Sequence, residues 1–244
     1  MGRWLQKCYS GDQTMKQADD YAKMQKEQYE TTSHLMIGNH RSHDNNLDYK
    51  GILLEPIFKM KGGFALDFGC GHGRNVQNLL AENIFDRVDG VDISANNVEY
   101  ATKNIIKSGV DSSKFNLMVN TGLEVSVLPS DEYSFVMSTI VLQHICCYDI
   151  RFNILKDIYR SMKQDGILSF QMGFGTEHMN TAGYFDNAFN ATATNSLHDV
   201  RVENEDQIIG DLIKIGFDKE NISTEIRPSF EDRHNQWIYV KAVK

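Results

Sequence analysis

The segment Phe64–Asn75, with the sequence FALDFGCGHGRN, constrains the fold of this chain more than any other segment. An apolar run ends in Asp67 and opens into glycines at three alternate positions, Gly69, Gly71 and Gly73. The residues that follow have the spacing of a helix. A strand, a glycine turn and a helix in this order form a binding loop on an α/β sheet, because glycine lets the backbone approach a ligand closely.

The spacing of the glycines indicates which ligand the loop binds. A dinucleotide fingerprint has glycine at its first, third and sixth positions, whereas the sixth position counted from Gly69 is Arg74. Downstream, the alternating segment Arg87–Ile93 contains Asp92, which lies 23 residues after Gly69. At about this distance an acidic residue at the end of the second strand meets a ribose. The two oxygens of a carboxylate match the two ribose hydroxyl groups.

Taken together, these motifs resemble those of the class I S-adenosylmethionine (SAM)-dependent methyltransferases. The resemblance covers about residues 65–243 and includes Val141–Ile145 (VLQHI), Ile158–Gly166 (IYRSMKQDG) and Gly216–Phe217. It implies an α/β fold with a doubly wound, mostly parallel, seven-stranded Rossmann-like sheet and one antiparallel strand near the C-terminus. It also implies SAM as the cofactor.

The resemblance further implies which residues hold the cofactor. The Asp67 carboxylate suits the ammonium group of SAM, Asp92 suits its ribose, and Ile93 offers an apolar face to its adenine. Asn120 stands where the family often has an acidic residue near the adenine amino group, so Asn120 or a backbone group is expected to replace it. The expected cofactor-binding residues are Asp67, Gly69, Cys70, Gly71, Gly73, Asp92, Ile93, Asn120, Thr121, Ser138 and Gln143.

The candidate catalytic residue is His144, which follows the fourth expected strand at the edge where open α/β sheets bind ligands. Histidine titrates near neutral pH and suits a general base, although His144 could instead only line the pocket. The segment 173–203 exceeds the usual length of an αβ loop, about two to six residues, and is expected to form a substrate lid. Its His178 and His198 match no metal site, and no metal is expected.

Composition restricts the partners. A net charge of −8 and a pI of about 5.5 disfavour nucleic acid and anionic membranes, which bind basic surfaces. No apolar run reaches the roughly 18 residues that span a bilayer, and no signal peptide is recognised. The four cysteines form no metal or disulfide pattern, which favours reduced thiols and a cytoplasmic location. The expected partner is a small-molecule acceptor.

Two parts of the chain are expected. Residues 1–60 form an N-terminal helical cap, with an apolar stripe at helical spacing in the first 34 residues and a second helix over Leu47–Phe58. Residues 61–244 form the methyltransferase domain. Its strands are expected at 64–68, 87–92, 115–120, 133–139, 166–172, 222–227 and 236–243, and its helices at 75–82, 94–107, 149–162 and 205–215.

The leading hypothesis is a SAM-dependent methyltransferase that acts on an oxygen or nitrogen of a small polar metabolite, such as a sugar or nucleotide-sugar. A second hypothesis is a non-catalytic SAM-binding or interaction module. A third is an NAD-dependent oxidoreductase, which Arg74 at the sixth glycine position disfavours.

Overall fold

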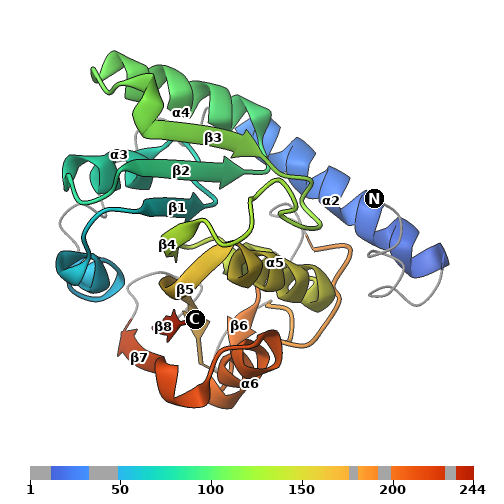
Figure 1. Cartoon of the computed structure of the whole chain (residues 1–244). Helices are drawn as coiled ribbons and strands as arrows, with labels where there is room; N and C mark the ends of the chain where they lie inside the picture. The colour runs from blue at the N-terminus through green and yellow to red at the C-terminus, as the bar shows by residue number, and fades with distance from the viewer. Residues whose placement is uncertain (1–11, 33–48, 176–180, 192–198, 229–234) are drawn as a thin grey trace.

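The computed structural model describes residues 12–32, 49–175, 181–191, 199–228 and 235–244. Seven strands form one sheet in the order β3-β2-β1-β4-β5-β8-β7, and a short strand, β6, also pairs with β5 (Figure 1). The strands are β1 (Phe64–Phe68), β2 (Arg87–Asp92), β3 (Phe115–Val119), β4 (Tyr133–Ser138), β5 (Met162–Phe174), β6 (Arg201–Val202), β7 (Ile222–Pro228) and β8 (Gln236–Val243). Only β8 runs against its neighbours, so the predicted doubly wound, mostly parallel sheet is confirmed.

Helices cover both faces of this sheet. Figure 1 shows α3 (Arg74–Ala81) and α4 (Ala95–Lys107) on one face, and α5 (Tyr148–Ser161) and α6 (Glu205–Ile215) on the other. The start of α4 follows from its sequence, because the Ser94 hydroxyl accepts a hydrogen bond from the Asn97 N–H and caps the helix. At α6, Asn204 and Gln207 form a capping box.

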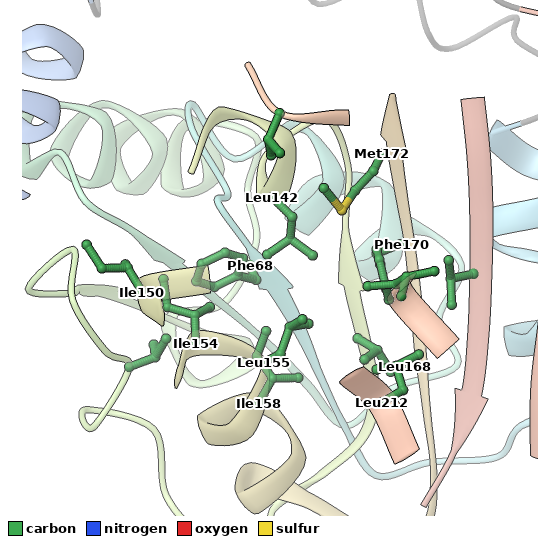
Figure 2. Close-up of a cluster of buried hydrophobic side chains, with 14 of the residues drawn as sticks. Phe68, Leu142, Ile150, Ile154, Leu155, Ile158, Leu168, Phe170, Met172 and Leu212 are labelled. Atoms are coloured by element: carbon green, nitrogen blue, oxygen red, sulfur yellow. The ribbon is translucent and has the colours of Figure 1, made fainter. Parts of the chain in front are cut away.

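The larger apolar core lies between the sheet and α5. Figure 2 shows Ile150 and Ile154 of α5 near Phe68 of β1, while Leu168 and Phe170 of β5 lie on the other side of the same cluster. The α5 residues recur at intervals of four, so they lie on one face of the helix, which is buried on the sheet. A smaller core on the opposite face joins β1 and β2 to α3.

The helix predicted over Leu47–Phe58 is wrong as a single element. Its first two residues lie outside the described part of the chain. The rest forms a π-helical turn, η3 (Tyr49–Leu53), and a separate 3-10 turn, η4 (Glu55–Lys59). Pro56 lies in the first turn of η4. The N–H groups of a first turn make no hydrogen bond within the helix, so proline is tolerated there. Proline cannot continue a preceding helix, so η4 begins as a new turn after η3.

Two features of the sheet also differ from the prediction. Strand β5 begins at Met162 rather than Gly166, because it continues through a register shift opposite Tyr133 and Phe135, with Asp165 at a positive φ of 61°. Strand β6 was not predicted, since a strand of two residues has no recognisable alternation. The first difference lengthens β5, and the second adds a short strand that pairs with β5.

The topology creates a binding edge where β1 has β2 on one side and β4 on the other. Connections diverge there, and open α/β sheets bind ligands in the crevice outside the carboxyl ends of such strands. Helix α2 (Asp12–Thr32) lies beyond the carboxyl ends of β2 and β3, next to α4 (Figure 1). None of the described helices combines the length and the apolar character needed to cross a membrane.

Candidate active site

A cavity of about 360 Å3 lies at this binding edge. One group of lining residues, called here the glycine-loop wall, consists of Phe68–Asn75 without Gly73, together with Asp92, Ile93, Asn97, Asn120 and Gly122. The other group, called here the histidine wall, consists of Tyr21, Gln25 and Tyr29 of α2 with Thr139, Ile140, Val141, His144, Ile145 and Ile154. The volume falls in the range of small-molecule sites.

The three glycines of the loop serve different purposes, although all have positive φ. A Cβ on Gly69 would lie 2.3 Å from Cγ2 of Val141, and one on Gly73 would lie 3.0 Å from Cβ of Ala101 in α4. A Cβ on Gly71 would meet no protein atom within 4 Å. Gly69 and Gly73 therefore permit packing within the protein, whereas Gly71 leaves open space beside the cavity.

Asp92 ties the glycine loop to the end of β2. One carboxylate oxygen accepts a hydrogen bond from the Gly71 N–H at 2.9 Å, and the other accepts from the Ser94 N–H at 2.9 Å and from Asn97 Nδ2 at 3.1 Å. Burial raises the pKa of this carboxyl above its usual range, against the effect of these bonds. Two carboxylate oxygens offer about four acceptor positions, so one remains for a donor in the cavity.

Asp67 lies behind the loop and is fully buried. Its Oδ1 accepts a hydrogen bond from Asn75 Nδ2 at 3.3 Å, and its Oδ2 has no hydrogen-bond partner among the described residues. Burial raises the pKa of this carboxyl to about 7, although the Asn75 bond and the nearby Arg74 charge lower it. A buried carboxyl oxygen without a partner fits the ammonium group that the family resemblance assigns to it.

His144 forms a pair with Asp199 on the histidine wall. Its Nδ1 lies 2.5 Å from Oδ1 of Asp199, and the Asp199 side chain is only 1% exposed against 25% for His144. A carboxylate can only accept, so Nδ1 donates and Nε2 is the ring nitrogen left to take a proton. Asp199 comes from the segment 173–203, 55 residues away in sequence.

Helix α2 holds the turn that carries His144. The Tyr21 hydroxyl accepts a hydrogen bond from the Cys146 N–H at 2.9 Å and donates to the His144 carbonyl at 3.4 Å. Gln25 Nε2 donates to the Ala191 carbonyl at 2.9 Å. In the same turn Ile140 has a positive φ of 58°, which is strained for a β-branched residue and is typical of functional sites.

The predicted residues divide between the cavity and its support. Those on the cavity walls are Gly69, Cys70, Gly71, Asp92, Ile93, Asn120 and His144. Those away from the walls are Asp67, Gly73, Thr121, Ser138 and Gln143. Among the latter, the buried Ser138 hydroxyl donates to the Phe68 carbonyl, and the Thr121 hydroxyl accepts from the Leu123 N–H in a local turn.

Several lining residues were not among the predicted site residues. They are Tyr21, Gln25, Tyr29, Phe68, His72, Arg74, Asn75, Asn97, Gly122, Thr139, Ile140, Val141, Ile145 and Ile154. Asn75 and Asn97 could have been found from the motifs, because each lies within one helical turn of a motif residue. The α2 residues carried no such signal, since their apolar spacing indicates only a docking face.

The expected lid lies partly within the described structure. Residues 173–175, 181–191 and 199–203 are described, whereas His178 and His198 lie outside the described residues. Among the residues that are described, no three His, Cys, Asp or Glu side chains gather to hold a metal ion. Cys70, Cys146 and Cys147 are buried and free of disulfides.

Comparison with known proteins places these features in a family context. A family model described as a methyltransferase domain matches residues 66–170. An uncharacterized protein of Haemophilus influenzae is 28% identical over 126 residues, which are 52% of this chain and 48% of that protein. The matched part of the chain therefore spans about half the length of this curated relative.

Two solved structures are similar in fold. Phosphoethanolamine N-methyltransferase 2 of Haemonchus contortus, in complex with SAM, gives a TM-score of 0.57 at 21% identity over 79% of this chain and 51% of that chain. A SAM-dependent methyltransferase from Methanosarcina mazei gives a TM-score of 0.58 at 15% identity over 78% of this chain and 96% of that chain. At these identities the likeness concerns the fold.

Proposed function

We propose that this chain, in which residues 66–170 match the methyltransferase-domain model, is a class I SAM-dependent methyltransferase and transfers a methyl group from SAM to a small polar acceptor. The observation that carries the proposal is the cavity itself. The glycine-loop wall has the glycine loop and Asp92, and the histidine wall has a histidine held by a buried carboxylate.

The glycine-loop wall supports the cofactor half of the proposal. Gly71 leaves open space beside the cavity, Asp92 keeps an acceptor position for a ribose hydroxyl, and Ile93 gives the adenine an apolar surface. Asn120 also lies on this wall and can offer its amide to the adenine edge. When bound, SAM supplies a methyl group already activated on a sulfonium, so the chain need only align the acceptor and exclude water.

The histidine wall favours an acceptor group that loses a proton during methyl transfer. His144 Nε2 is available to take that proton, and Asp199 holds the ring in the required tautomer and stabilises the imidazolium that forms. A hydroxyl group needs such a base, whereas a neutral amine attacks without one. The pair therefore favours an oxygen acceptor over a nitrogen acceptor.

The cavity also bears on the kind of acceptor. Its histidine wall offers tyrosine and glutamine side chains of α2 beside apolar residues. These neutral polar groups suit a small hydroxylated molecule, and a sugar or nucleotide-sugar is our specific expectation. The alternative is a non-catalytic SAM-binding module, in which the glycine-loop wall binds SAM but the histidine wall does not promote methyl transfer.

The proposal is tested by incubating the chain with SAM and metabolite extract and searching by mass spectrometry for products that gain one methyl group. Phosphoethanolamine is added as a separate arm, since the structural neighbour from Haemonchus contortus carries that substrate in its name. We expect a methylated hydroxyl compound that the His144→Ala variant does not form. Tight SAM binding without any methylated product from repeated extracts would favour the non-catalytic module.

A further inference from the structure

Arg151 is a buried arginine behind the turn that carries His144. It lies near the start of α5, and only 1% of it is exposed. Its Nη1 donates a hydrogen bond to the Ile145 carbonyl at 2.6 Å, and its Nη2 donates to the Tyr184 carbonyl. Within the described structure no carboxylate forms an ion pair with it. Burying a cation costs free energy, so the reason for this arginine is sought in what its two hydrogen bonds hold together.

The two carbonyls belong to the two segments that carry the pair of His144 and Asp199. Ile145 follows His144 directly in the turn after β4. Tyr184 belongs to the other segment, in which the Ala182 N–H donates to the Asp199 carbonyl at 2.9 Å. One planar guanidinium, with its donors in a rigid fork, therefore joins the segment of the histidine to the segment of the carboxylate.

The same two segments also meet beside the pair. The Val200 N–H donates to the Gln143 carbonyl at 2.7 Å. The pKa of the buried Cys146 thiol is raised to about 12, mainly by burial; the Asp199 carboxylate raises this pKa and the Arg151 charge lowers it. Both charged groups thus lie close enough to act on one residue of the turn.

Two tyrosine rings orient the guanidinium. Its carbon lies 4.8 Å from the centre of the Tyr184 ring and 5.8 Å from the centre of the Tyr148 ring. The hydroxyls of these tyrosines donate to the buried Asp211 of α6 at 2.9 Å and 2.8 Å. Since the rings are held by α6 and attract the cation, the guanidinium has a fixed position between the two segments.

We propose that Arg151 is a positioning residue for the His144–Asp199 pair. By holding the Ile145 and Tyr184 carbonyls it keeps the two segments aligned, so that Nδ1 of the imidazole stays protonated and Nε2 stays free to accept a proton. The inference rests on the proposed function, in which His144 is the base. Arg151 does not line the cavity, so it acts through the pair and not on a ligand.

The test measures which ring nitrogen of His144 carries the proton. Nitrogen-15 NMR of the histidine side chains is recorded at about pH 9, where histidine rings are neutral. The signals of His144 are those missing from the spectrum of His144→Gln. Each ring nitrogen has a different chemical shift with and without its proton, so the spectrum gives the ratio of the two tautomers.

In the wild type we expect the Nδ1–H tautomer to predominate, because Asp199 accepts from Nδ1. Arg151→Lys keeps the charge but has no planar fork to span the two carbonyls. The ratio of Nδ1–H to Nε2–H should then fall by about 10-fold, the factor that loss of a hydrogen bond to a charged group gives. Arg151→Gln carries no buried charge and serves as a second variant if Arg151→Lys does not fold.

Tyr184→Phe is the matched control. It removes the hydroxyl that donates to Asp211 but leaves the ring and the backbone carbonyl that Arg151 contacts. It should lower the melting temperature, as the Arg151 variants do, without changing the tautomer ratio. Calorimetry with S-adenosylhomocysteine (SAH) should give a Kd within about twofold of the wild type in every variant.

The outcomes separate the inference from the proposed function. If folded Arg151→Lys or Arg151→Gln keeps the wild-type ratio, or if Tyr184→Phe lowers the ratio equally, the inference is wrong and the proposed function stands. If the wild type lacks the Nδ1–H tautomer, the base role of His144 fails and the inference fails with it. If the wild type does not bind SAH, the proposed function itself fails. A fall confined to the Arg151 variants supports the positioning role.

Discussion

The two walls of the cavity are built in different ways. The glycine-loop wall comes mainly from one stretch of chain, Phe68 to Asn97, in which the loop and the end of β2 bond directly through Gly71 and Asp92. The histidine wall joins three distant segments. Tyr21 contacts the Cys146 amide across 125 residues, and Asp199 reaches His144 across 55.

This difference bears on what each wall does. A ligand shared by a whole family needs the same contacts in every member, and a short continuous motif can supply them. An acceptor that differs between members is better met by segments that vary independently, such as a terminal helix and a long loop. We therefore expect changes in the glycine-loop wall to alter cofactor binding and changes in the histidine wall to alter turnover.

Gly71→Val should have the largest effect, loss of measurable SAH binding. A Cβ at this position meets no protein atom, so its branched side chain would occupy the space beside the cavity, and the positive φ of 49° adds strain. Calorimetry measures the binding, and circular dichroism checks that the secondary structure remains. Normal SAH binding by the folded variant would remove the loop from the cofactor site.

His144→Ala should lower kcat by roughly 10²- to 10⁴-fold on a hydroxyl acceptor, the usual contribution of a general base. Its affinity for SAH should remain nearly unchanged, because the residue belongs to the other wall. Steady-state kinetics and calorimetry on one preparation measure both effects. If turnover is retained with an unaltered pH profile, His144 only lines the pocket.

Asp92→Ala should weaken SAH binding by about 1–3 kcal/mol, since the ribose hydroxyls lose a charged acceptor. The same change leaves the N–H groups of Gly71 and Ser94 without their acceptor, which also loosens the loop. Asp89→Asn on the same strand is a useful control, because Asp89 pairs with Arg87 and lies outside the cavity wall. An unchanged Kd in folded Asp92→Ala would contradict the ribose assignment.

Asp67 should make SAH binding depend on pH. Its pKa is about 7 because of burial, so below pH 7 the carboxyl is protonated and must release its proton to pair with the ligand ammonium. The Kd should therefore rise several-fold from about pH 8 to about pH 6, at most tenfold per pH unit. Asp67→Asn should bind more weakly at high pH and lose this dependence. An identical pH profile in both proteins would exclude Asp67 as its source.

The raised pKa of Asp67 also predicts that the stability of the ligand-free protein falls as the pH rises, whereas the affinity for SAH increases. The pKa of the Asp67 carboxyl in the folded state, about 7, lies above its usual value of 3.8, so the folded state holds the extra proton between these values. The contribution of Asp67 to the free energy of unfolding is fully present below pH 3.8 and is lost as the pH rises through about 7. Ligand-free Asp67→Asn should thus melt above the wild type near pH 8, and the two should converge near pH 4.

Tyr21→Phe should have the smallest effect on ligand binding and turnover. It should also lower the free energy of unfolding by about 1–3 kcal/mol, because the buried Cys146 amide loses its acceptor. Turnover should fall modestly while SAH affinity stays the same. Tyr159→Phe, whose hydroxyl donates to the Gly216 carbonyl away from the cavity, serves as the matched control. Equal turnover in both variants would mean that α2 does not position the histidine turn.

Sequence alone predicted the sheet well because each central strand has its own signal. The bounds of β1 and β2 were correct, since an apolar run ends in a motif at each carboxyl end. The start of β5 and the helix near Pro56 were wrong, because a register shift and a helical break depend on neighbouring strands and local backbone strain. Short-range patterns carry no information about either.

The sequence predicted only those residues of the candidate site that lie in short continuous motifs. The motif spacing located Gly71 and Asp92 on the wall, but it could not distinguish them from Gly73, which packs against α4. The partner of His144 was not predicted, because Asp199 is one of several polar residues in a long segment. Only the folding of that segment onto the β4 turn brings the two together.

Titration calorimetry of the wild type with SAH and with NADH, in parallel, tests the central claim most directly. We predict one SAH bound per chain and no detectable heat from NADH, because Arg74 occupies the position of the third dinucleotide glycine and Asp67 Oδ2 has no hydrogen-bond partner in the described structure. Binding of NADH in preference to SAH, or of neither, would contradict the assignment of this cavity to SAM.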